Sequence, residues 1–353
     1  MTDQRRPRVA VLTMGGTIAS MPGDDVARGV SPRLAATDLV AAIHGIDEVA
    51  ELEAVSFRQV PSSDLTLDDL IELQRTIRER IAAGCAGVVV AQGTDSLEET
   101  AFTLDLLNDM DATIVVTGAM RNPTLLGADG LANLLAAIRV AASAECRGLG
   151  CVVVFNDEIH AGRYVRKTHT TSLATFRSPT VGALGWIGEA VPRLALRPVH
   201  RRWLPVETLG AIPPVALVTL GPGEDGRLLR AVPDCGYHGL VVEALGGGHV
   251  PARLVDELEA LAGRIPVALT SRTGSGEVLR HTYGFTGSEG DLLRRGLIWA
   301  GALDGPKARV LLALALAAGA DRAGVIHAFH AFGVPNAGMA DGAVKLQKMR
   351  PHA

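Results

Sequence analysis

Cysteine is scarce in this sequence. Its 353 residues include four cysteines, Cys85, Cys146, Cys151 and Cys235, and none of them lies in a CxxC pair or at the spacing of metal ligands. This pattern excludes a disulfide-stapled secreted domain and a zinc site built on cysteine pairs. We interpret the four residues as free, mostly buried thiols in a reducing compartment.

The sequence also lacks a hydrophobic run long enough to span a bilayer. The apolar segments 87–90, 152–155 and 310–318 are short, and each is bounded by turn or polar residues. The polar and basic start of the chain leads into a strand-like segment with no apolar signal-peptide core or cleavage site. We therefore expect no membrane partner and a cytoplasmic location.

Positive charge is not concentrated anywhere in the chain. The net charge is −4 and the charged residues are spread along the sequence, so no basic stripe is present for a nucleic-acid backbone. Hydrophobic residues make up 48% of the chain, which is enough for a large buried core. These features favour a globular protein that binds a small molecule.

Lysine is rare although basic residues are not. Only four of the 34 basic residues are lysines, and Lys167 is the only one before Lys307. Arginine stays charged in proteins, whereas lysine can release a proton, so an isolated lysine in a polar segment is a candidate for proton transfer. The alternative on composition alone is that Lys167 survives by chance.

Apolar, β-prone segments alternate with amphipathic segments along the chain. Strands are predicted at 8–13, 53–60, 87–92, 113–118 and 150–156, and later at 215–220, 239–243 and 266–270. Helices are predicted at 67–83, 97–108, 130–143, 251–262, 306–319 and 321–332, with Thr66, the Ser96/Glu99 pair and Asp129 as N-caps of the first three. This alternation is typical of an α/β protein with a doubly wound, mostly parallel sheet.

The pattern breaks between Val191 and Pro214, where proline and arginine dominate. Such a composition suits an extended linker. We therefore expect an N-terminal domain over 1–190, a linker over 191–213 and a smaller C-terminal α/β domain over 214–353. The tail from Gly333 shows no periodicity and is expected to be irregular.

Polar residues follow the predicted strands of the first domain, at the edge where open parallel sheets bind ligands. In chain order they are Thr17 after a glycine pair, Ser62 with Ser63, Thr94 with Asp95, and Lys167 in a predicted polar loop over 156–179. A hydroxyl nucleophile, a lysine that can exchange protons and glycine amides for an oxyanion are the parts that amide hydrolysis requires. Singly, each has a plainer interpretation, as a helix cap, a helix-dipole partner or a solvated charge.

Several of these segments carry a family resemblance. Met14-Gly15-Gly16-Thr17-Ile18-Ala19 and the segment from Gln92 to Thr100 resemble the two signatures of the asparaginase and glutaminase family. Gly118 to Arg121 resembles a further shared turn, and Arg163 to Phe176 looks like the family's lysine-bearing loop. The segments around Tyr283 and Lys307 also match, so the resemblance spans nearly the whole chain.

The resemblance implies an amidohydrolase that converts L-asparagine to L-aspartate and ammonia, with some glutaminase activity and no metal or organic cofactor. By position, Thr17 would form the acyl-enzyme, while Thr94, Asp95 and Lys167 would handle protons. Substrate binding would involve Ser62, Ser63 and Asp95, and also Glu277, which the family supplies from a partner subunit. The family's active sites form between subunits, so a homo-oligomer, a tetramer or a dimer, is implied.

The sequence departs from the family pattern at two places. The segment from Ala19 to Arg33 contains no tyrosine to close over Thr17, and Val30 or Arg28 would have to serve instead. Ser63 replaces a longer glutamine beside Ser62.

Three other functions are compatible with parts of the sequence. One is a non-catalytic amino-acid sensor or structural subunit on the same fold, favoured by the missing tyrosine. Another is a nucleotide-dependent enzyme, because 221–226 matches GxGxxG, although Glu224 and Asp225 place negative charge where a pyrophosphate would bind. The third is an aminoacyl-tRNA amidotransferase subunit, which the absence of a basic surface disfavours.

Overall fold

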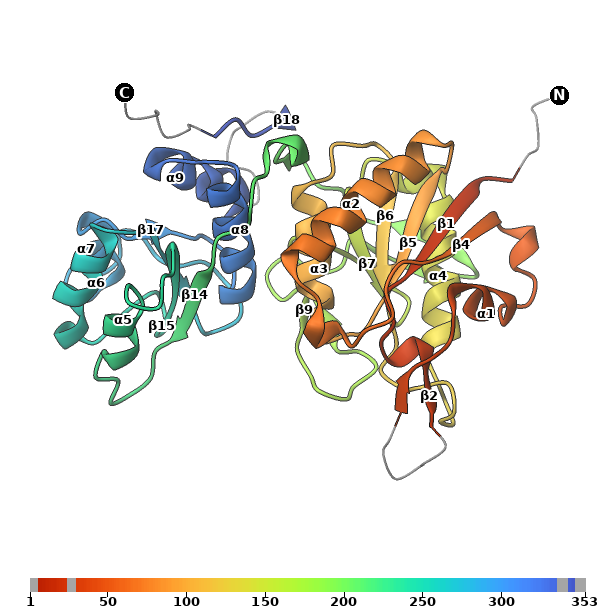
Figure 1. Cartoon of the computed structure of the whole chain (residues 1–353), viewed down its shortest axis with the longest axis horizontal. Helices are drawn as coiled ribbons and strands as arrows, with labels where there is room; N and C mark the ends of the chain where they lie inside the picture. The colour runs from red at the N-terminus through yellow and green to blue at the C-terminus, as the bar shows by residue number, and fades with distance from the viewer. Residues whose placement is uncertain (1–5, 24–29, 335–341, 347–353) are drawn as a thin grey trace. The chain divides into compact units, whose positions relative to one another are not determined.

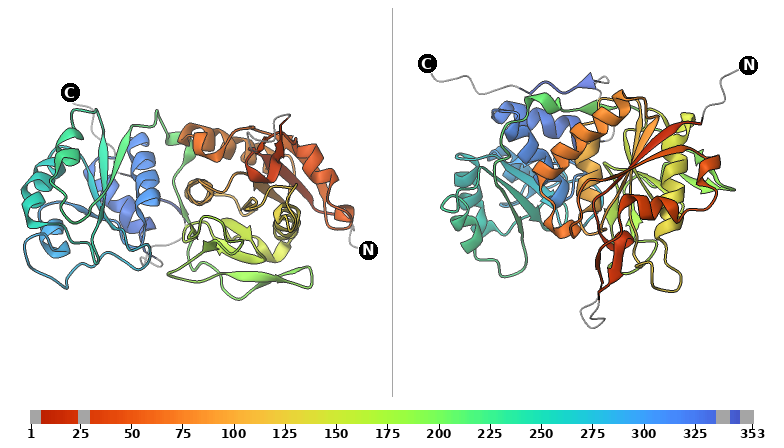
Figure 2. Two further views of the ribbon diagram at one scale, coloured as in Figure 1. Left: turned by 90° about the horizontal axis from the view of Figure 1, so that it is seen from below. Right: turned by 45° about the vertical axis from the view of Figure 1, so that its right-hand side comes forward.

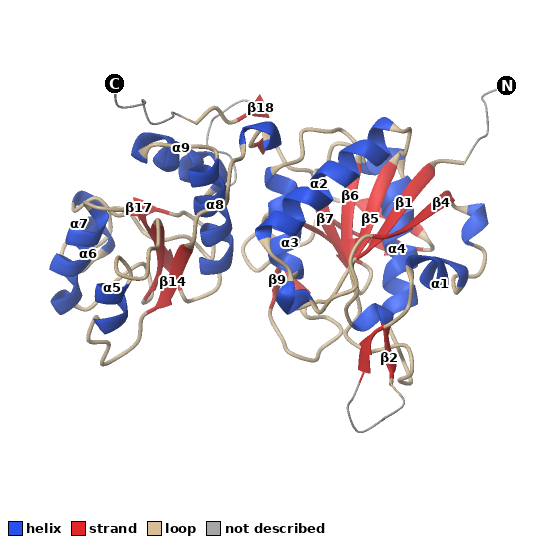
Figure 3. Cartoon of the chain, in the orientation of Figure 1, coloured by secondary structure: helices blue, strands red, loops and turns tan. Residues whose placement is uncertain are grey.

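The computed structural model describes residues 6–23, 30–334 and 342–346 of the chain. These residues belong to two compact units, Met1–Pro198 and Val199–Ala353 (Figure 1). Figure 3 shows that helices and strands alternate in both units, as the sequence predicts. Over the described residues, no helix is both long and apolar enough to cross a membrane.

The first unit is built on an eight-stranded sheet in the order β12-β11-β8-β7-β6-β5-β1-β4. Its strands are β1 Arg8–Thr13, β4 Glu51–Ser56, β5 Gly87–Ala91, β6 Thr113–Thr117, β7 Cys151–Phe155, β8 Glu158–Ala161, β11 Gly185–Gly188 and β12 Val191–Leu194. Strands β4, β1, β5, β6 and β7 are parallel, while β8, β11 and β12 add an antiparallel edge. The predicted α/β class with a mostly parallel sheet is confirmed.

Helices cover both faces of this sheet because alternate side chains of each strand point to opposite sides. On β5, Val88 and Val90 belong to the cluster under α2 Leu67–Ala82 and α3 Leu97–Leu106. Val89 and Ala91 belong to the cluster on the other face, under α1 Ala36–Ala41 and α4 Gly130–Ala142. Figure 1 shows α2 and α3 in front of the strands and α4 behind them.

The antiparallel edge of the sheet is formed by two hairpins, which were not predicted from the sequence. Asn156 and Asp157 connect β7 to β8, and Glu189 and Ala190 connect β11 to β12, all four with positive φ. Two-residue turns of this kind favour Asn and Gly, so a Glu-Ala pair carries no recognisable signal. The predicted polar loop over 156–179 was therefore wrong in part, because it contains β8 and the short strands β9 Arg166–Lys167 and β10 Phe176–Arg177. The segment predicted as a linker begins with β12.

The second unit has a parallel sheet in the order β14-β15-β16-β17. Its strands are β14 Val215–Thr219, β15 Gly239–Ala244, β16 Val267–Ser271 and β17 Ile298–Trp299, and its helices are α5 Arg227–Ala231, α6 Val255–Ala262, α7 Glu289–Arg294, α8 Gly305–Ala317 and α9 Arg322–Phe332. Figure 2 shows α8 on one side of the strands and α5 with α6 on the other. The expected second, smaller α/β unit is thus present.

The remaining elements are short. The strands β2 Ser20–Pro22 and β3 Val30–Pro32 form an antiparallel ribbon, and β13 Arg202–Trp203 pairs with β18 Gly342–Ala343. The expectation of a wholly irregular tail from Gly333 was therefore wrong at β18. The 3-10 turns are Thr17–Ala19, Ile46–Glu48, Ser62–Asp64, Ala144–Cys146, Val206–Thr208 and Ala252–Leu254. Arg28, a suggested lid residue, lies outside the described residues, and Val30 is exposed.

Candidate active site

The strand order of the first unit places a ligand site at the carboxyl ends of β1 and β5. Strand β1 pairs with β4 on one side and with β5 on the other, although the chain visits β4 before β5. The connections that follow β1 and β5 therefore diverge, and such a switch point is where open parallel sheets bind their ligands. The polar segments 14–20 and 92–96 leave the sheet at this point.

Glycines let the backbones of these segments touch. A Cβ on Gly16 would lie 2.0 Å from the nitrogen of Gly93, and Gly16 has a φ of +82°. A Cβ on Gly93 would lie 2.6 Å from Ser62 Oγ, and one on Gly15 would lie 2.7 Å from the carbonyl oxygen of Val60. No residue type other than glycine fits such close approaches. The lack of side chains at these glycines therefore lets the segments 14–20 and 92–96 pack against each other and against the segment 60–62.

Thr17 follows the turn formed by Gly15 and Gly16. It follows Gly16 directly and begins the 3-10 turn Thr17–Ala19, with Ser20 Oγ donating to the Gly16 carbonyl oxygen at 2.8 Å. Thr94 follows Gly93 in the same way. The two hydroxyl residues are therefore next to the point where the backbones of Gly16 and Gly93 meet.

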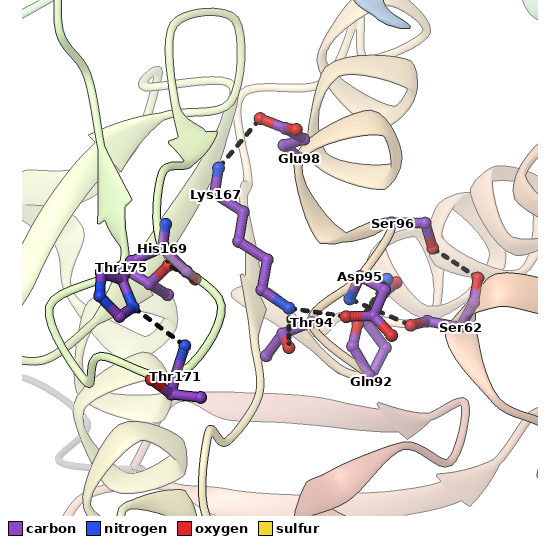
Figure 4. Close-up of polar contacts among 11 residues, drawn as sticks. Ser62, Gln92, Thr94, Asp95, Ser96, Glu98, Lys167, His169, Thr171 and Thr175 are labelled. Atoms are coloured by element: carbon purple, nitrogen blue, oxygen red, sulfur yellow. Dashed lines mark hydrogen bonds and ion pairs between the residues drawn. The ribbon is translucent and has the colours of Figure 1, made fainter.

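Thr94, Asp95 and Lys167 form one cluster (Figure 4). Lys167 Nζ donates to Thr94 Oγ1 at 2.9 Å and to Asp95 Oδ1 at 2.6 Å, across 73 and 72 residues of sequence. The Lys167 side chain is 17% exposed, Thr94 is buried, and the Asp95 side chain is 73% exposed. A mostly buried amine thus connects a buried hydroxyl with a carboxylate that faces solvent.

The backbone of Lys167 is held by a residue to which the sequence assigned no role. The amide of Lys167 donates to Glu98 Oε2 at 3.0 Å, and Glu98 lies in the first turn of α3 (Figure 4). Lys167 also pairs with Phe176 in the β9–β10 ribbon. Glu98 lies in the segment from Gln92 to Thr100, which resembles the second family signature. Its place in this segment was the only sequence feature that could have indicated a role in the site.

Ser62 and Ser63 differ in their surroundings. Ser62 is 4% exposed, and its Oγ accepts the Asp95 amide at 3.2 Å. Ser96 is the N-cap residue of α3, as predicted, but the predicted capping box with Glu99 was wrong. Ser96 Oγ donates instead to the Ser62 carbonyl oxygen at 2.7 Å and so joins two loops. Ser63 is exposed, and its Oγ lies 3.4 Å from Asp64 Oδ1.

The turn after β6 lies against the same loops. A Cβ on Gly118 would be 2.5 Å from the Gln92 carbonyl oxygen. The carboxylate of Asp129 accepts the backbone amides of Met120 and Arg121, the latter at 2.8 Å, and the side-chain amide of Asn133 at 3.0 Å, but makes no capping bond to the backbone of α4. The predicted side-chain cap at Asp129 was therefore wrong, because this carboxylate anchors the preceding turn.

Two further predicted features belong to the second unit. Glu277 is exposed and belongs to the second unit, so it does not share a compact unit with the other predicted site residues. In the GxGxxG segment, Glu224 Oε1 accepts the amides of Asp225 and Gly226, and Asp225 Oδ1 accepts that of Arg227. Amides that would hold a pyrophosphate are thus taken by the loop's own carboxylates, which supports the interpretation as a tight turn.

The four cysteines of the chain are free thiols. Cys85, Cys146 and Cys151 are free and buried, and Cys235 is free and exposed, which confirms the predicted thiols. Burial raises the pKa of each of the three buried thiols. Within residues 6–23, 30–334 and 342–346, no three His, Cys, Asp or Glu side chains gather closely enough to hold a metal ion.

The chain is similar to known proteins along most of its length. Residues 8–199 match the family model of the asparaginase N-terminal domain, and residues 214–329 match that of the glutaminase/asparaginase C-terminal domain. An L-asparaginase of Bacillus licheniformis is 36% identical over 88% of this chain and 95% of its own length. L-asparaginase 2 of Escherichia coli is 32% identical over 88% of this chain and 89% of its own.

A solved structure shows the same fold. The crystal structure of a probable cytoplasmic L-asparaginase from Campylobacter jejuni superposes with a TM-score of 0.82 at 30% identity, covering 92% of this chain and 99% of that one. Both domain models, the relatives along most of the chain and the shared fold lead to one conclusion. The chain belongs to the asparaginase and glutaminase family.

Proposed function

We propose that this chain is an L-asparaginase, which hydrolyses the side-chain amide of L-asparagine to give L-aspartate and ammonia through an acyl-enzyme on Thr17. The observation that carries the proposal is the Thr94–Lys167–Asp95 cluster beside the Gly16–Gly93 contact. It provides an amine, a carboxylate and a hydroxyl next to the turn that presents Thr17. Relatives named as L-asparaginases over most of the chain support the substrate.

In the proposed reaction the Thr17 hydroxyl oxygen attacks the side-chain carbonyl carbon of asparagine and loses its proton. The tetrahedral intermediate releases ammonia when its nitrogen receives a proton, and water then attacks the acyl-enzyme to release aspartate. Amide groups of the glycine turn would stabilise the oxyanion in both steps. The reaction uses side chains and backbone alone, so the proposal includes no cofactor or metal.

The lysine cluster is proposed to move the protons. Lys167 Nζ donates to both Thr94 Oγ1 and Asp95 Oδ1, so Asp95 orients the amine while Thr94 connects it to the reacting groups. After the Lys167 amine has given up a proton, it can accept the proton of the Thr94 hydroxyl. The Thr94 oxygen can then accept a proton from the attacking water, and so orients and activates this water. The low exposure of Lys167 and the burial of Thr94 limit the competition of bulk water for the hydrogen bond between them.

The α-amino and α-carboxylate groups of the substrate would bind on the other side of the cluster. Asp95 is largely exposed and would pair with the α-ammonium group. The Ser62 oxygen accepts the Asp95 amide, so its own hydroxyl hydrogen can donate to the α-carboxylate, with Ser63 beside it. The preference between asparagine and glutamine then depends on the length of the substrate side chain that fits between these groups and Thr17.

We further propose that the functional form is a homo-oligomer, a tetramer or a dimer, in which Glu277 of one subunit approaches the α-ammonium group in another. The exposed position of Glu277 in the second unit suits this role. Mixing inactive Thr17→Ala chains with inactive Glu277→Ala chains should restore part of the activity, because some mixed sites would contain both native residues. Absence of any restoration in verified mixed oligomers would contradict a shared site.

A cytoplasmic location is part of the proposal. The free thiols suit a reducing compartment. The structural relative from Campylobacter jejuni is named as a probable cytoplasmic L-asparaginase, whereas a relative from Haemophilus influenzae is named as a probable periplasmic one. Fractionation of the native cells would decide between the two compartments.

The test of the function is ammonia release from L-asparagine and L-glutamine, measured side by side with the purified chain. We expect release from asparagine, weaker release from glutamine, and a loss of at least about 10³-fold in Thr17→Ala, which removes the nucleophile. Circular dichroism of Thr17→Ala should match the wild type. Binding of asparagine without ammonia release by the wild type would instead identify the non-catalytic sensor.

A further inference from the structure

The turn that joins β9 to β10 has an internal organisation of its own. The amide and the hydroxyl of Thr168 both donate to the Thr175 carbonyl oxygen, each at 2.8 Å. The His169 amide donates to Thr175 Oγ1 at 3.0 Å, and this hydroxyl donates to the His169 carbonyl oxygen. Thr175 is fully buried, so it anchors the base of the turn.

The tip of this turn is organised by one imidazole ring. His169 Nδ1 accepts the amide of Thr171 at 3.0 Å (Figure 4). It also accepts the amide of Ser172 at 3.0 Å. A nitrogen that accepts two N–H groups carries no hydrogen, so the ring is in the tautomer protonated at Nε2. The side chain is exposed and lies outside the Thr94–Lys167–Asp95 cluster, yet it begins two residues after Lys167.

We propose that His169 is a positioning residue for Lys167, which acts by closing the turn at the end of β9. The inference rests on the proposed function in so far as it assigns Lys167 a part in proton transfer. The ribbon β9–β10 is only two residue pairs long, Phe176 with Lys167 and Arg177 with Arg166. So short a ladder does not hold its own register, and the turn must supply the missing constraints.

The position of the lysine backbone matters because its side chain is long and flexible. Nζ reaches Thr94 and Asp95 at hydrogen-bond distance only while the Lys167 backbone stays bonded to Glu98 and to β10. If the tip of the turn opens, Thr168 and His169 lose their contacts with Thr175, and the end of β9 is freed. A displacement of the order of 1 Å is enough to slow catalysis strongly when it moves a reacting group.

The experiment uses three substitutions that differ in one acceptor. In His169→Asn the amide oxygen takes nearly the place of Nδ1 and can accept the same two N–H groups. In His169→Gln the amide group reaches the place of Nε2, and His169→Ala has no acceptor. Because the His169 side chain is exposed, all three variants are expected to fold, and the thermal midpoint of each verifies this.

The first readout is the kinetics of ammonia release from asparagine. We expect kcat to fall about tenfold in His169→Ala and His169→Gln, since about two hydrogen bonds are lost, with KM changed less than about twofold. His169→Asn should keep kcat within about twofold of the wild type. A residue that only stabilised the surface would lower the thermal midpoint without this kcat pattern.

The second readout does not depend on activity. Because the chain has only four lysines, the side-chain signals of protein labelled with ¹³C-lysine can be assigned by substituting each lysine in turn. We expect the Lys167 signal to shift in His169→Ala and His169→Gln but not in His169→Asn. If the wild type releases no ammonia while the signal still shifts, the proposed function fails and the positioning role stands. An unmoved Lys167 signal together with an unchanged kcat in His169→Ala would overturn the positioning role.

Discussion

The backbone of Gly16 lies against the backbone of Gly93, so closely that a Cβ on Gly16 would be 2.0 Å from the Gly93 nitrogen. The two residues are the last before Thr17 and Thr94. Their contact joins the loops that follow β1 and β5, the strands between which the sheet reverses its order. The absence of two side chains thus determines how near the candidate nucleophile is to the lysine cluster.

This contact predicts a severe effect of Gly16→Ala. The added carbon would clash with backbone atoms, and alanine is also disfavoured at a φ of +82°. We expect a loss of about 3 kcal/mol or more in stability and little activity. Gly221→Ala is the control, since nothing lies within 4 Å of its added carbon, and it should change the thermal midpoint hardly at all. A Gly16→Ala variant with normal activity would refute the close contact.

Lys167→Arg should be almost as damaging as removal of the side chain. Arginine keeps the positive charge beside Asp95 but does not release a proton in the physiological range, and its planar group does not fit the two bonds of Nζ. We expect kcat to fall by about 10²-fold or more. Lys345→Arg, at an exposed lysine of the second unit, is the matched control. Wild-type activity in Lys167→Arg would show that proton release by this residue is not needed.

Glu98 should act on activity through the Lys167 backbone. Its Oε2 accepts the Lys167 amide at 3.0 Å, and Glu98→Gln keeps an oxygen that can accept this bond, whereas Glu98→Ala does not. We expect kcat to fall about tenfold in Glu98→Ala and about threefold or less in Glu98→Gln. Steady-state ammonia release measures both. Equal losses in the two variants would point to the charge of Glu98 and not to its hydrogen bond.

His160 should make the protein less stable in mild acid. Burial lowers the pKa of this ring below its ordinary value, against the opposing effect of Glu158, whose Oε2 lies 3.2 Å from Nε2. Between the lowered pKa and the ordinary value near 6.5, the unfolded chain binds more protons than the folded one, so stability decreases as the pH falls through this window.

Calorimetric thermal midpoints of the wild type and His160→Gln between pH 5 and 8 provide the measurement. The substitution should remove a slope of at most about 1.4 kcal/mol per pH unit below about pH 6.5 and change nothing in the slope above it. The same pH dependence in both proteins would show that His160 takes up its proton without a penalty in the folded state.

Much of the first unit could be predicted because its strands are short, apolar and followed by polar residues. The prediction for β1 matched its bounds, and Thr66 caps α2 as its sequence suggests, with its hydroxyl accepting the Asp69 amide. Local signals suffice for such features, since the interacting atoms lie within a few residues of one another. They failed where a side chain bonds to a loop and not to the start of its own helix backbone, as those of Ser96 and Asp129 do.

The sequence by itself determined the α/β alternation, the glycine turn before Thr17 and the isolation of Lys167 among arginines. Only the tertiary structure decided that Lys167 Nζ reaches Thr94 and Asp95, that Glu98 holds the Lys167 backbone, and that the Ser96 hydroxyl joins two loops instead of closing a capping box. The physical reason is the range of the interactions. Backbone preferences act between neighbours in the chain, whereas these hydrogen bonds join atoms more than 30 residues apart and exist only once the sheet has brought its strand ends together.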